Sequence, residues 1–379
     1  MRVFESGVYR PPMHGHSLLL RVTENCPWNK CRFCMLYKGE QFRTRPLEKI
    51  LEEIDSMAEI KQMLESHIKG GVFDMSAVRA EYAALKTDKE KECYSMVYDW
   101  IAGGNKESMF LQDGNTMVLK TDWLLAILER IRTHLPELKI IASYGRADTL
   151  CMKSAEEFKE LRAAGLNMMH CGYETGSDDT LKLINKGFTT AQELEAGHKL
   201  KDAGITMNLF YMPGNGGSNN CLKNAAESAA VVNDIEPDYV RLRSFVLKNG
   251  SPLWEMEKQG EFKNCTENEK VTELRAFIER LNGLDTYIIS DHIINLLDIE
   301  GRVKTDKNKM LGDIDFYLSL SEREQRRYQL ARRGYYLSSL KYMNMLGQEE
   351  KAFIDRAVDK IGSAEEWEKL MQELTEKMI

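Results

Sequence analysis

Apolar residues in the first 250 positions alternate between two kinds of pattern. Helical spacing is one, and Leu47, Ile50, Leu51, Ile54 and Met57 are its first example. Short, nearly continuous apolar runs are the other, and each predicts a β-strand buried on both faces; they occupy residues 17–23, 108–112, 139–144, 167–172, 205–211 and 238–245. Strands alternating with helices predict parallel βα units. Because six units are fewer than a closed barrel needs, we expect an α/β fold with an open, partial (β/α)6 TIM-like barrel.

Two segments depart from this rhythm. Residues 59–105 have mainly helical patterns and predict an insertion that ends at Gly103, Gly104 and Asn105. From Pro252 onward the pattern is almost entirely helical. We therefore expect a barrel domain at residues 1–250, which includes the insertion at about 59–105, and a mostly helical C-terminal extension at 251–379.

One helix of the predicted barrel has clear signals at both ends. Ser154 followed by Glu157 predicts a capping box at its start, and Gly165 predicts its end.

Composition narrows the class of protein. The 379 residues contain no apolar run long enough to span a membrane and no signal-peptide pattern at the N-terminus. A net charge of −7 argues against broad binding to nucleic-acid phosphates. Five of the eight cysteines are scattered, and we expect them to be small buried apolar residues. Together with twenty methionines, they favour a reducing, anaerobic cytoplasm.

The other three cysteines, Cys26, Cys31 and Cys34, fall within nine residues directly after the first predicted strand. Thiolates bind soft metals and iron–sulfur clusters, and three of them leave one iron of a cluster open for an outside ligand. A structural zinc site completed by His14 or His16 is an alternative. We expect these two histidines on the surface or at a pocket rim, because neither has the spacing of a zinc motif.

Polar residues and glycines also follow the later strands. They are Asp113, Gly114 and Asn115 after the second, Ser143 and Arg146 at the third, Tyr173 and Glu174 after the fourth, and Pro213 and Gly214 after the fifth. The carboxyl ends of barrel strands share one face, which carries the active site. The spacing therefore predicts one site that includes the cysteine loop.

With these motifs the chain resembles the radical S-adenosylmethionine (radical SAM) enzymes over roughly residues 17–250. The pattern is most similar to the branch with oxygen-independent coproporphyrinogen oxidase, the methylthiotransferases and the elongator catalytic subunit. The cysteine spacing is C-x4-C-x2-C, one residue longer than the commonest family motif. The resemblance implies that Cys26, Cys31 and Cys34 hold a [4Fe–4S] cluster whose open iron binds S-adenosylmethionine.

The resemblance also implies contacts to S-adenosylmethionine. Phe33 occupies the aromatic position whose backbone lies near the adenine. Glu174 would bind the ribose or the amino group, and Lys182 the methionine carboxylate, with Lys186 as a second choice. A surface position for Lys182 and a capping role for Glu174 are the alternatives. The family's segment for the methionine amino group corresponds to Asp113, Gly114 and Asn115, and Ser143 and Arg146 are further candidates.

The implied reaction is reductive cleavage of S-adenosylmethionine to a 5′-deoxyadenosyl radical, which abstracts a hydrogen atom from the substrate. A reducing partner of the flavodoxin or ferredoxin type is expected. We see no second cysteine cluster and no recognisable RNA-binding or cobalamin-binding domain, so we expect a small-molecule substrate and no membrane partner. RNA or peptide modification is the alternative among enzymes. A non-catalytic partner or chaperone that keeps the cluster, or zinc, is the alternative outside them.

Two groups of arginines are candidates for binding anions. Arg241 and Arg243 alternate along the sixth strand and suit a substrate carboxylate or phosphate, with ion pairing at the barrel mouth as the alternative. The second group lies near Tyr328, Tyr335 and Tyr336, and Glu322 and Glu324 among its members favour a solvated helix face over an RNA site. It consists of Arg323, Arg326, Arg327, Arg332 and Arg333.

Overall fold

The computed structural model describes residues 3–7, 9–10, 12–104 and 106–378. The chain divides into two compact units. The first contains the described residues up to Pro27, Gly39–Cys171 and Lys199–Thr206; the second contains Trp28–Lys38, Gly172–His198 and the described residues from Met207 onward. The division runs through the cysteine loop, so Cys26 belongs to the first unit and Cys31 and Cys34 to the second.

The first unit is built on parallel strands that confirm four of the predicted six. Their order is β1 (Leu18–Arg21), β6 (Ser108–Gln112), β7 (Ile140–Gly145) and β8 (Leu166–Glu174), and the last three residues of β8 belong to the second unit. Leu19 pairs with Phe110, which pairs with Ala142, and these three residues form a buried cluster. All of β6 is buried, which explains its continuous apolar run.

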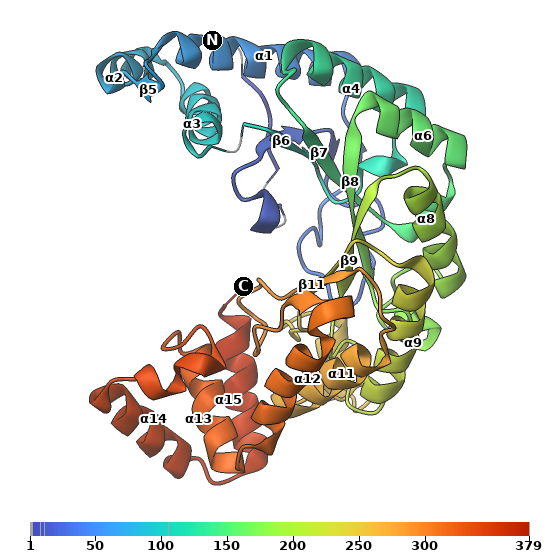
Figure 1. Cartoon of the computed structure of the whole chain (residues 1–379), viewed down its shortest axis with the longest axis vertical. Helices are drawn as coiled ribbons and strands as arrows, with labels where there is room; N and C mark the ends of the chain where they lie inside the picture. Colours follow the sequence, from blue (N-terminus) through green and yellow to red (C-terminus); the bar gives the residue numbers. More distant parts are fainter. Residues whose placement is uncertain (1–2, 8, 11, 105, 379) are drawn as a thin grey trace. The chain divides into compact units, whose positions relative to one another are not determined.

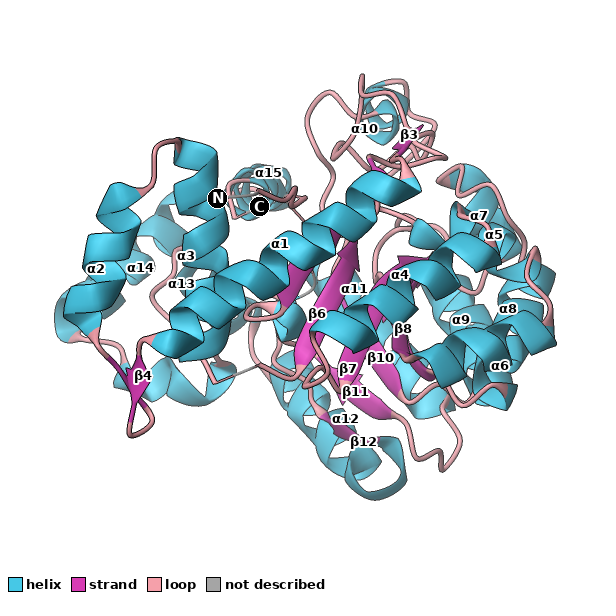
Figure 2. Cartoon of the chain, turned by 90° about the horizontal axis from the view of Figure 1, so that it is seen from above, coloured by secondary structure: helices cyan, strands magenta, loops and turns pink. Residues whose placement is uncertain are grey.

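Helices α1 (Leu47–Ser66), α4 (Thr121–His134) and α6 (Ala155–Ala164) pack in series, and Figure 2 shows α1 and α4 side by side. The capping box of Ser154 and Glu157 is present at α6, and Gly165 ends this helix with a φ of 117°, so both predictions are confirmed. The remaining short elements are η1 (Pro12–His14), β2 (Thr23–Glu24), β3 (Arg43–Thr44), η2 (Thr116–Val118) and α5 (Ala147–Cys151).

The segment expected as an insertion is largely helical. Helix α1 continues into it, and α2 (Met75–Ala84) and α3 (Asp88–Ala102) follow. A hairpin of β4 (Ile68–Lys69) and β5 (Val72–Phe73) was not expected, although its two-residue Gly70–Gly71 turn, with φ of 60° and 82°, is the signal for one. Asn105, at the expected end of the insertion, lies outside the described residues.

The second unit contains the two remaining predicted strands, β9 (Thr206–Tyr211) and β10 (Tyr239–Leu242), which pair in parallel. Strand β11 (Tyr287–Ile289) extends them in parallel, and β12 (Gly301–Arg302) closes this edge in the antiparallel direction. These two short strands lie where a helical pattern was expected. The α/β class is thus confirmed, with a mostly parallel sheet.

Helices dominate the rest of the second unit. Helix α9 packs against α11, and Figure 1 shows α13, α14 and α15 side by side. None of the described helices is long and apolar enough to cross a membrane. The helices are α7 (Asp178–Leu183), α8 (Thr190–Asp202), α9 (Cys221–Ile235), α10 (Pro252–Lys258), α11 (Glu267–Arg280), α12 (Val303–Ser319), α13 (Glu322–Arg333), η3 (Leu340–Met345), α14 (Gln348–Lys360) and α15 (Ala364–Glu376).

The arginines of α13 are largely engaged within the unit. Arg323 and Arg327 pair with Asp355 of α14, and Arg326 pairs with Glu322. Arg333 is buried and its guanidinium pairs with the carboxylate of Glu267. These contacts fit a helix face that is structural rather than open to RNA, although the prediction of a fully solvated face is wrong for Arg333.

Candidate functional site

The cysteine loop, residues 25–42, contains no helix or strand. Its three cysteines form no disulfide among the described residues; Cys31 is buried, and Cys26 and Cys34 are half-buried. In the described part of the chain, no three side chains of the His, Cys, Asp and Glu types lie close enough together to hold a metal ion. Three cysteine thiols on one short loop are nevertheless the donor set that an iron–sulfur cluster requires, so the residues present fit this group.

The start of the loop is held in the first unit by Asp113. Its carboxylate, 2% exposed, accepts hydrogen bonds from Arg21 Nε at 2.8 Å and from the backbone N–H of Asn25 at 3.1 Å. The backbone N–H of Asp113 donates to Thr23 Oγ1 at 3.3 Å. Asp113 is the first residue of the segment predicted to bind the methionine amino group. Its side chain positions the start of the cysteine loop.

The other residues of the first unit that were predicted to contact S-adenosylmethionine also make hydrogen bonds or ion pairs within the unit. Asn115 Nδ2 donates to Thr149 Oγ1 at 2.9 Å, Ser143 Oγ donates to the carbonyl of Leu111 at 3.0 Å, and Arg146 pairs with Asp148 at 3.1 Å. Gly114 lies in the turn after β6. A role for these residues toward S-adenosylmethionine stays a prediction.

His14 is buried, so its predicted place on the surface or at a pocket rim is wrong. Its Nε2 lies 2.9 Å from Nε2 of His170 and its Nδ1 lies 2.9 Å from Ser17 Oγ. Phe110 and Tyr144 surround the two imidazoles. With both ring nitrogens hydrogen-bonded, His14 is not available as a zinc ligand. His16 is exposed, as expected.

In the second unit, the middle of the cysteine loop is anchored to the residues after α7. Trp28 Nε1 donates to the carbonyl of Asn185 at 2.8 Å, and Asn185 Nδ2 donates to the carbonyl of Lys30 at 3.0 Å. Gly187 has a φ of 84°, and the Trp28 ring occupies the space that a Cβ would need. Only glycine suits this position, which lies in the connection between α7 and α8.

Glu174 and Lys186 form a mostly buried ion pair beside the loop. Lys186 Nζ lies 3.0 Å from Glu174 Oε1, and the two side chains are 7% and 13% exposed. The ammonium also lies 5.6 Å from the centroid of the Phe33 ring. Lys182 is exposed on α7. The structure thus brings the second-choice lysine, rather than the first, to Glu174.

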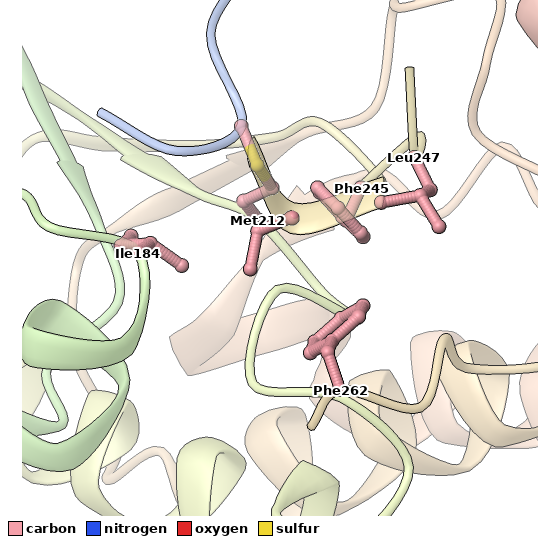
Figure 3. Packing of buried hydrophobic residues seen from close by; sticks show 6 residues of the cluster. Ile184, Met212, Phe245, Leu247 and Phe262 are labelled. Atoms are coloured by element: carbon pink, nitrogen blue, oxygen red, sulfur yellow. The ribbon is translucent and has the colours of Figure 1, made fainter. Parts of the chain in front are cut away.

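Phe33 packs against a buried apolar cluster of the second unit. Ile184, Met212, Phe245, Leu247 and Phe262 of this cluster appear in Figure 3, where the side chains of Met212, Phe245 and Phe262 lie close together. Phe33, the loop residue before Cys34, is therefore held by apolar packing.

Glu193, near the start of α8, was missed by the sequence analysis. Its carboxyl is fully buried, and neither oxygen has a hydrogen-bond partner among the described residues. Burial raises the pKa of Glu193 well above its ordinary value, opposed by the positive charge of Lys186.

Glu273 of α11 organises the loop after β9 and was also missed. Its carboxylate accepts hydrogen bonds from Tyr211 Oη at 2.8 Å, the backbone N–H of Gly214 at 2.9 Å and Asn224 Nδ2 at 2.7 Å. Burial raises the pKa of Glu273 to about 7, against the effect of these donors. Asn215 Nδ2 of the same loop donates to the carbonyl of Glu174 at 3.0 Å. A glutamate among the apolar positions of α11 was the available signal.

Of the two candidate arginines on the sixth predicted strand, Arg241 is 1% exposed and donates to Asp291 Oδ2 at 2.7 Å. Arg243 is half-buried, and its side chain makes no ion pair within the described residues. Ion pairing therefore accounts for Arg241 but not for Arg243.

Residues 20–229 match the family model of the radical SAM superfamily, which covers more than half of the chain. The chain belongs to the radical SAM superfamily. It is accordingly an enzyme of the class that uses a [4Fe–4S] cluster and S-adenosylmethionine and needs a reductant. The family predicted from the cysteine spacing and the strand ends is confirmed.

Curated relatives match part of the chain. The tRNA uridine(34) acetyltransferase of Methanocaldococcus infernus is 27% identical over 164 residues, which are 40% of this chain and 31% of that protein. The tRNA-2-methylthio-N(6)-dimethylallyladenosine synthase of Alkaliphilus oremlandii is 23% identical over 150 residues, 38% of this chain and 30% of that protein. The matches thus span about a third of the length of these relatives.

Solved structures are similar at lower identity. Elp3 of Methanocaldococcus infernus with an N-terminal deletion has a TM-score of 0.43 and 18% identity, covering 60% of this chain and 59% of that one. Coproporphyrinogen III oxidase (HemN) of Escherichia coli has a TM-score of 0.40 and 13% identity, covering 66% of this chain and 48% of that one.

Proposed function

We propose that this chain cleaves S-adenosylmethionine reductively at a cluster held by Cys26, Cys31 and Cys34, and that it abstracts a hydrogen atom from a small anionic substrate. The observation that carries the proposal is the anchoring of the three-cysteine loop beside the buried Glu174–Lys186 pair. When bound, the cluster supplies the electron for the cleavage.

The residues of the second unit would bind and orient S-adenosylmethionine. Glu174 suits the ribose hydroxyls or the amino group, because an ionised carboxylate accepts hydrogen bonds from such donors. Lys186 suits the methionine carboxylate, to which an ammonium gives a charge-assisted hydrogen bond. Phe33 would keep its backbone near the adenine, since its ring is packed in the apolar cluster. Burial of these groups excludes water, which strengthens each electrostatic contact.

The test is formation of 5′-deoxyadenosine, measured by mass spectrometry after anaerobic reconstitution with iron and sulfide, reduction with dithionite and addition of S-adenosylmethionine. We expect product from the wild type and none from the variant with Cys26→Ala, Cys31→Ala and Cys34→Ala. Lys186→Met should lower the rate by on the order of tenfold or more, since a lost charged hydrogen bond costs about 1.5–3 kcal/mol. Lys182→Met is the matched control and should stay within about twofold of the wild type.

Stoichiometric zinc in place of iron, or a full cluster without cleavage under any reductant, would overturn the proposal. Equal rates of 5′-deoxyadenosine formation in the Lys186 and Lys182 variants would exclude Lys186 as a ligand of S-adenosylmethionine.

Modification of tRNA is the second candidate, favoured by the names of the curated relatives. The paired arginines of α13 and the net charge of −7 weigh against a large RNA surface. Adding unfractionated tRNA to the same assay separates the two candidates. Release of 5′-deoxyadenosine above the rate without tRNA, together with a mass change in the tRNA nucleosides, would favour this second function.

A further inference from the structure

A small cavity in the second unit lies directly beside the cysteine loop. Phe33 and Cys34 line it on the loop side, and Met212, Arg243, Ser244 and Lys248 line it from the ends of β9 and β10. The backbone N–H of Arg243 donates to the carbonyl of Tyr211 at 3.0 Å, which continues the pairing of these two strands. The cavity is therefore built on the sheet rather than on an unsupported loop.

Positive charge gathers at this end of β10. Arg241 lies in β10, and Arg243 directly follows the last residue of this strand, where the backbone pairing with Tyr211 continues; the alternation of an extended chain therefore places both on one side. Leu242 between them lies on the other side, where Val271 and Leu274 of α11 line the same small hollow. Lys248 adds a third cation to the cavity wall. The carboxylates that face these three cations are Asp291, which pairs with Arg241, and Glu376, which acts on Lys248.

The electrostatics of neighbouring groups reflect this excess charge. Burial, together with the positive charges of Arg243 and Arg241, lowers the pKa of His292 to about 4. Burial also lowers the pKa of Lys248; Glu376 opposes this effect and Arg243 adds to it. Placing like charges together costs free energy unless an anion lies among them. Arg243 has no ion-pair partner in the described ranges, so its guanidinium remains available for such an anion.

Arg243 supplies hydrogen-bond donors at the wall of the cavity. The planar guanidinium of Arg243 can donate two parallel hydrogen bonds to a carboxylate or a phosphate.

We propose that Arg243 and Lys248, supported by the buried Arg241–Asp291 pair, form a binding site for an oxyanion group of the substrate, a carboxylate or a phosphate, next to Cys34. This inference rests on the proposed function, because it takes the cavity beside the cysteine loop as the place where the substrate binds. It narrows the substrate class to small molecules that carry such a group.

The experiment measures thermal unfolding of the full chain, reconstituted anaerobically, while inorganic phosphate or acetate is titrated against chloride at equal ionic strength. A ligand that binds the folded chain raises the unfolding midpoint with its concentration. We expect phosphate or acetate to raise the midpoint above the chloride value, and the tighter of the two identifies the preferred group. Arg243→Gln should weaken the binding on the order of tenfold, whereas Arg243→Lys, which keeps the charge, should weaken it less.

Arg356→Gln is the matched control, because Arg356 is an exposed arginine of α14 and should leave the binding unchanged. If Arg243→Gln does not fold, Lys248→Gln replaces it. Equal midpoints in phosphate, acetate and chloride, or equal binding by the Arg243 and Arg356 variants, would overturn the site. The titration needs no cleavage of S-adenosylmethionine, so its failure is distinct from failure of the proposed function.

Discussion

The two units treat the polar residues at their strand ends differently. In the first unit Asp113, Asn115, Ser143 and Arg146 all form hydrogen bonds or ion pairs within the unit. In the second unit Arg243 has no ion-pair partner among the described residues, and Glu193 is buried without a hydrogen bond. Satisfied groups position the backbone, whereas an unpaired group that lines a cavity, as Arg243 does, is free to meet a ligand. We therefore expect positioning roles in the first unit and a recognition role for Arg243 in the second.

Breaking the support of the first unit should have the largest effect. Asp113→Ala removes the partner of Arg21 and of the Asn25 N–H, and should lower the free energy of unfolding by about 3 kcal/mol, as expected when one partner of a buried pair is removed. Urea denaturation measures it. Glu107→Ala, which breaks the exposed Glu107–Lys139 pair of the same unit, is the control and should cost less than half as much. Equal losses would contradict the positioning role of Asp113.

The contact between Trp28 and Gly187 provides the next test, in the second unit. Gly187→Ala forces a left-handed residue and a clash with the Trp28 ring, and should cost about 2 kcal/mol or more. Gly204→Ala has a similar φ of 68° but no atom within 4 Å of the new Cβ, so its cost should be limited to about 1 kcal/mol. Urea denaturation of both variants measures the difference, and a cost for Gly187→Ala no greater than that for Gly204→Ala would exclude the clash.

A pH titration of stability tests the buried network of the second unit. The folded chain holds the Glu273 proton up to about pH 7, while the unfolded chain loses it near 4.5. Between these values the folded state binds more protons, so the contribution of Glu273 to stability falls as the pH rises, by at most about 1.4 kcal/mol per unit.

Glu368, with a pKa raised by burial to about 7, acts in the same direction, and His292, with a pKa near 4, acts in the opposite one. The comparison is therefore between the wild type and Glu273→Gln, which cannot ionise. Urea midpoints across this pH range should fall more steeply for the wild type. Parallel curves would show that Glu273 has an ordinary pKa.

The smallest effects on stability are expected from helix caps, which are local and occur in both units. Ser154→Ala in the first unit and Thr266→Ala in the second each remove the side chain of a capping box. Each should lower the free energy of unfolding by about 1 kcal/mol. Urea denaturation of the two variants should give similar losses. A much larger loss in one unit would mean that its cap also supports the site.

Local patterns were sufficient for much of the fold. The six apolar runs, the α6 cap at Ser154 and its end at Gly165 depend on residues close in sequence, and the structure has them. Strands β11 and β12 were missed because three and two residues are too few to show a period. His14 was misplaced because its partner His170 lies 156 positions away.

The candidate site likewise has features set by residues close in sequence and features set by residues far apart in the chain. Three cysteines within nine residues are a local motif, and together with the polar residues at the strand ends they carried the resemblance that implied the family, the cluster and S-adenosylmethionine. Local spacing could not distinguish Lys182 from Lys186, since the choice depends on which ammonium is buried against Glu174. Local spacing also could not reveal the role of Glu273, because its hydrogen-bond partners come from β9, from the loop after β9 and from α9. Nor could it reveal that Arg243 has no ion-pair partner among the described residues. Burial and ion pairing join residues far apart in the chain, and only the folded backbone decides which of them meet.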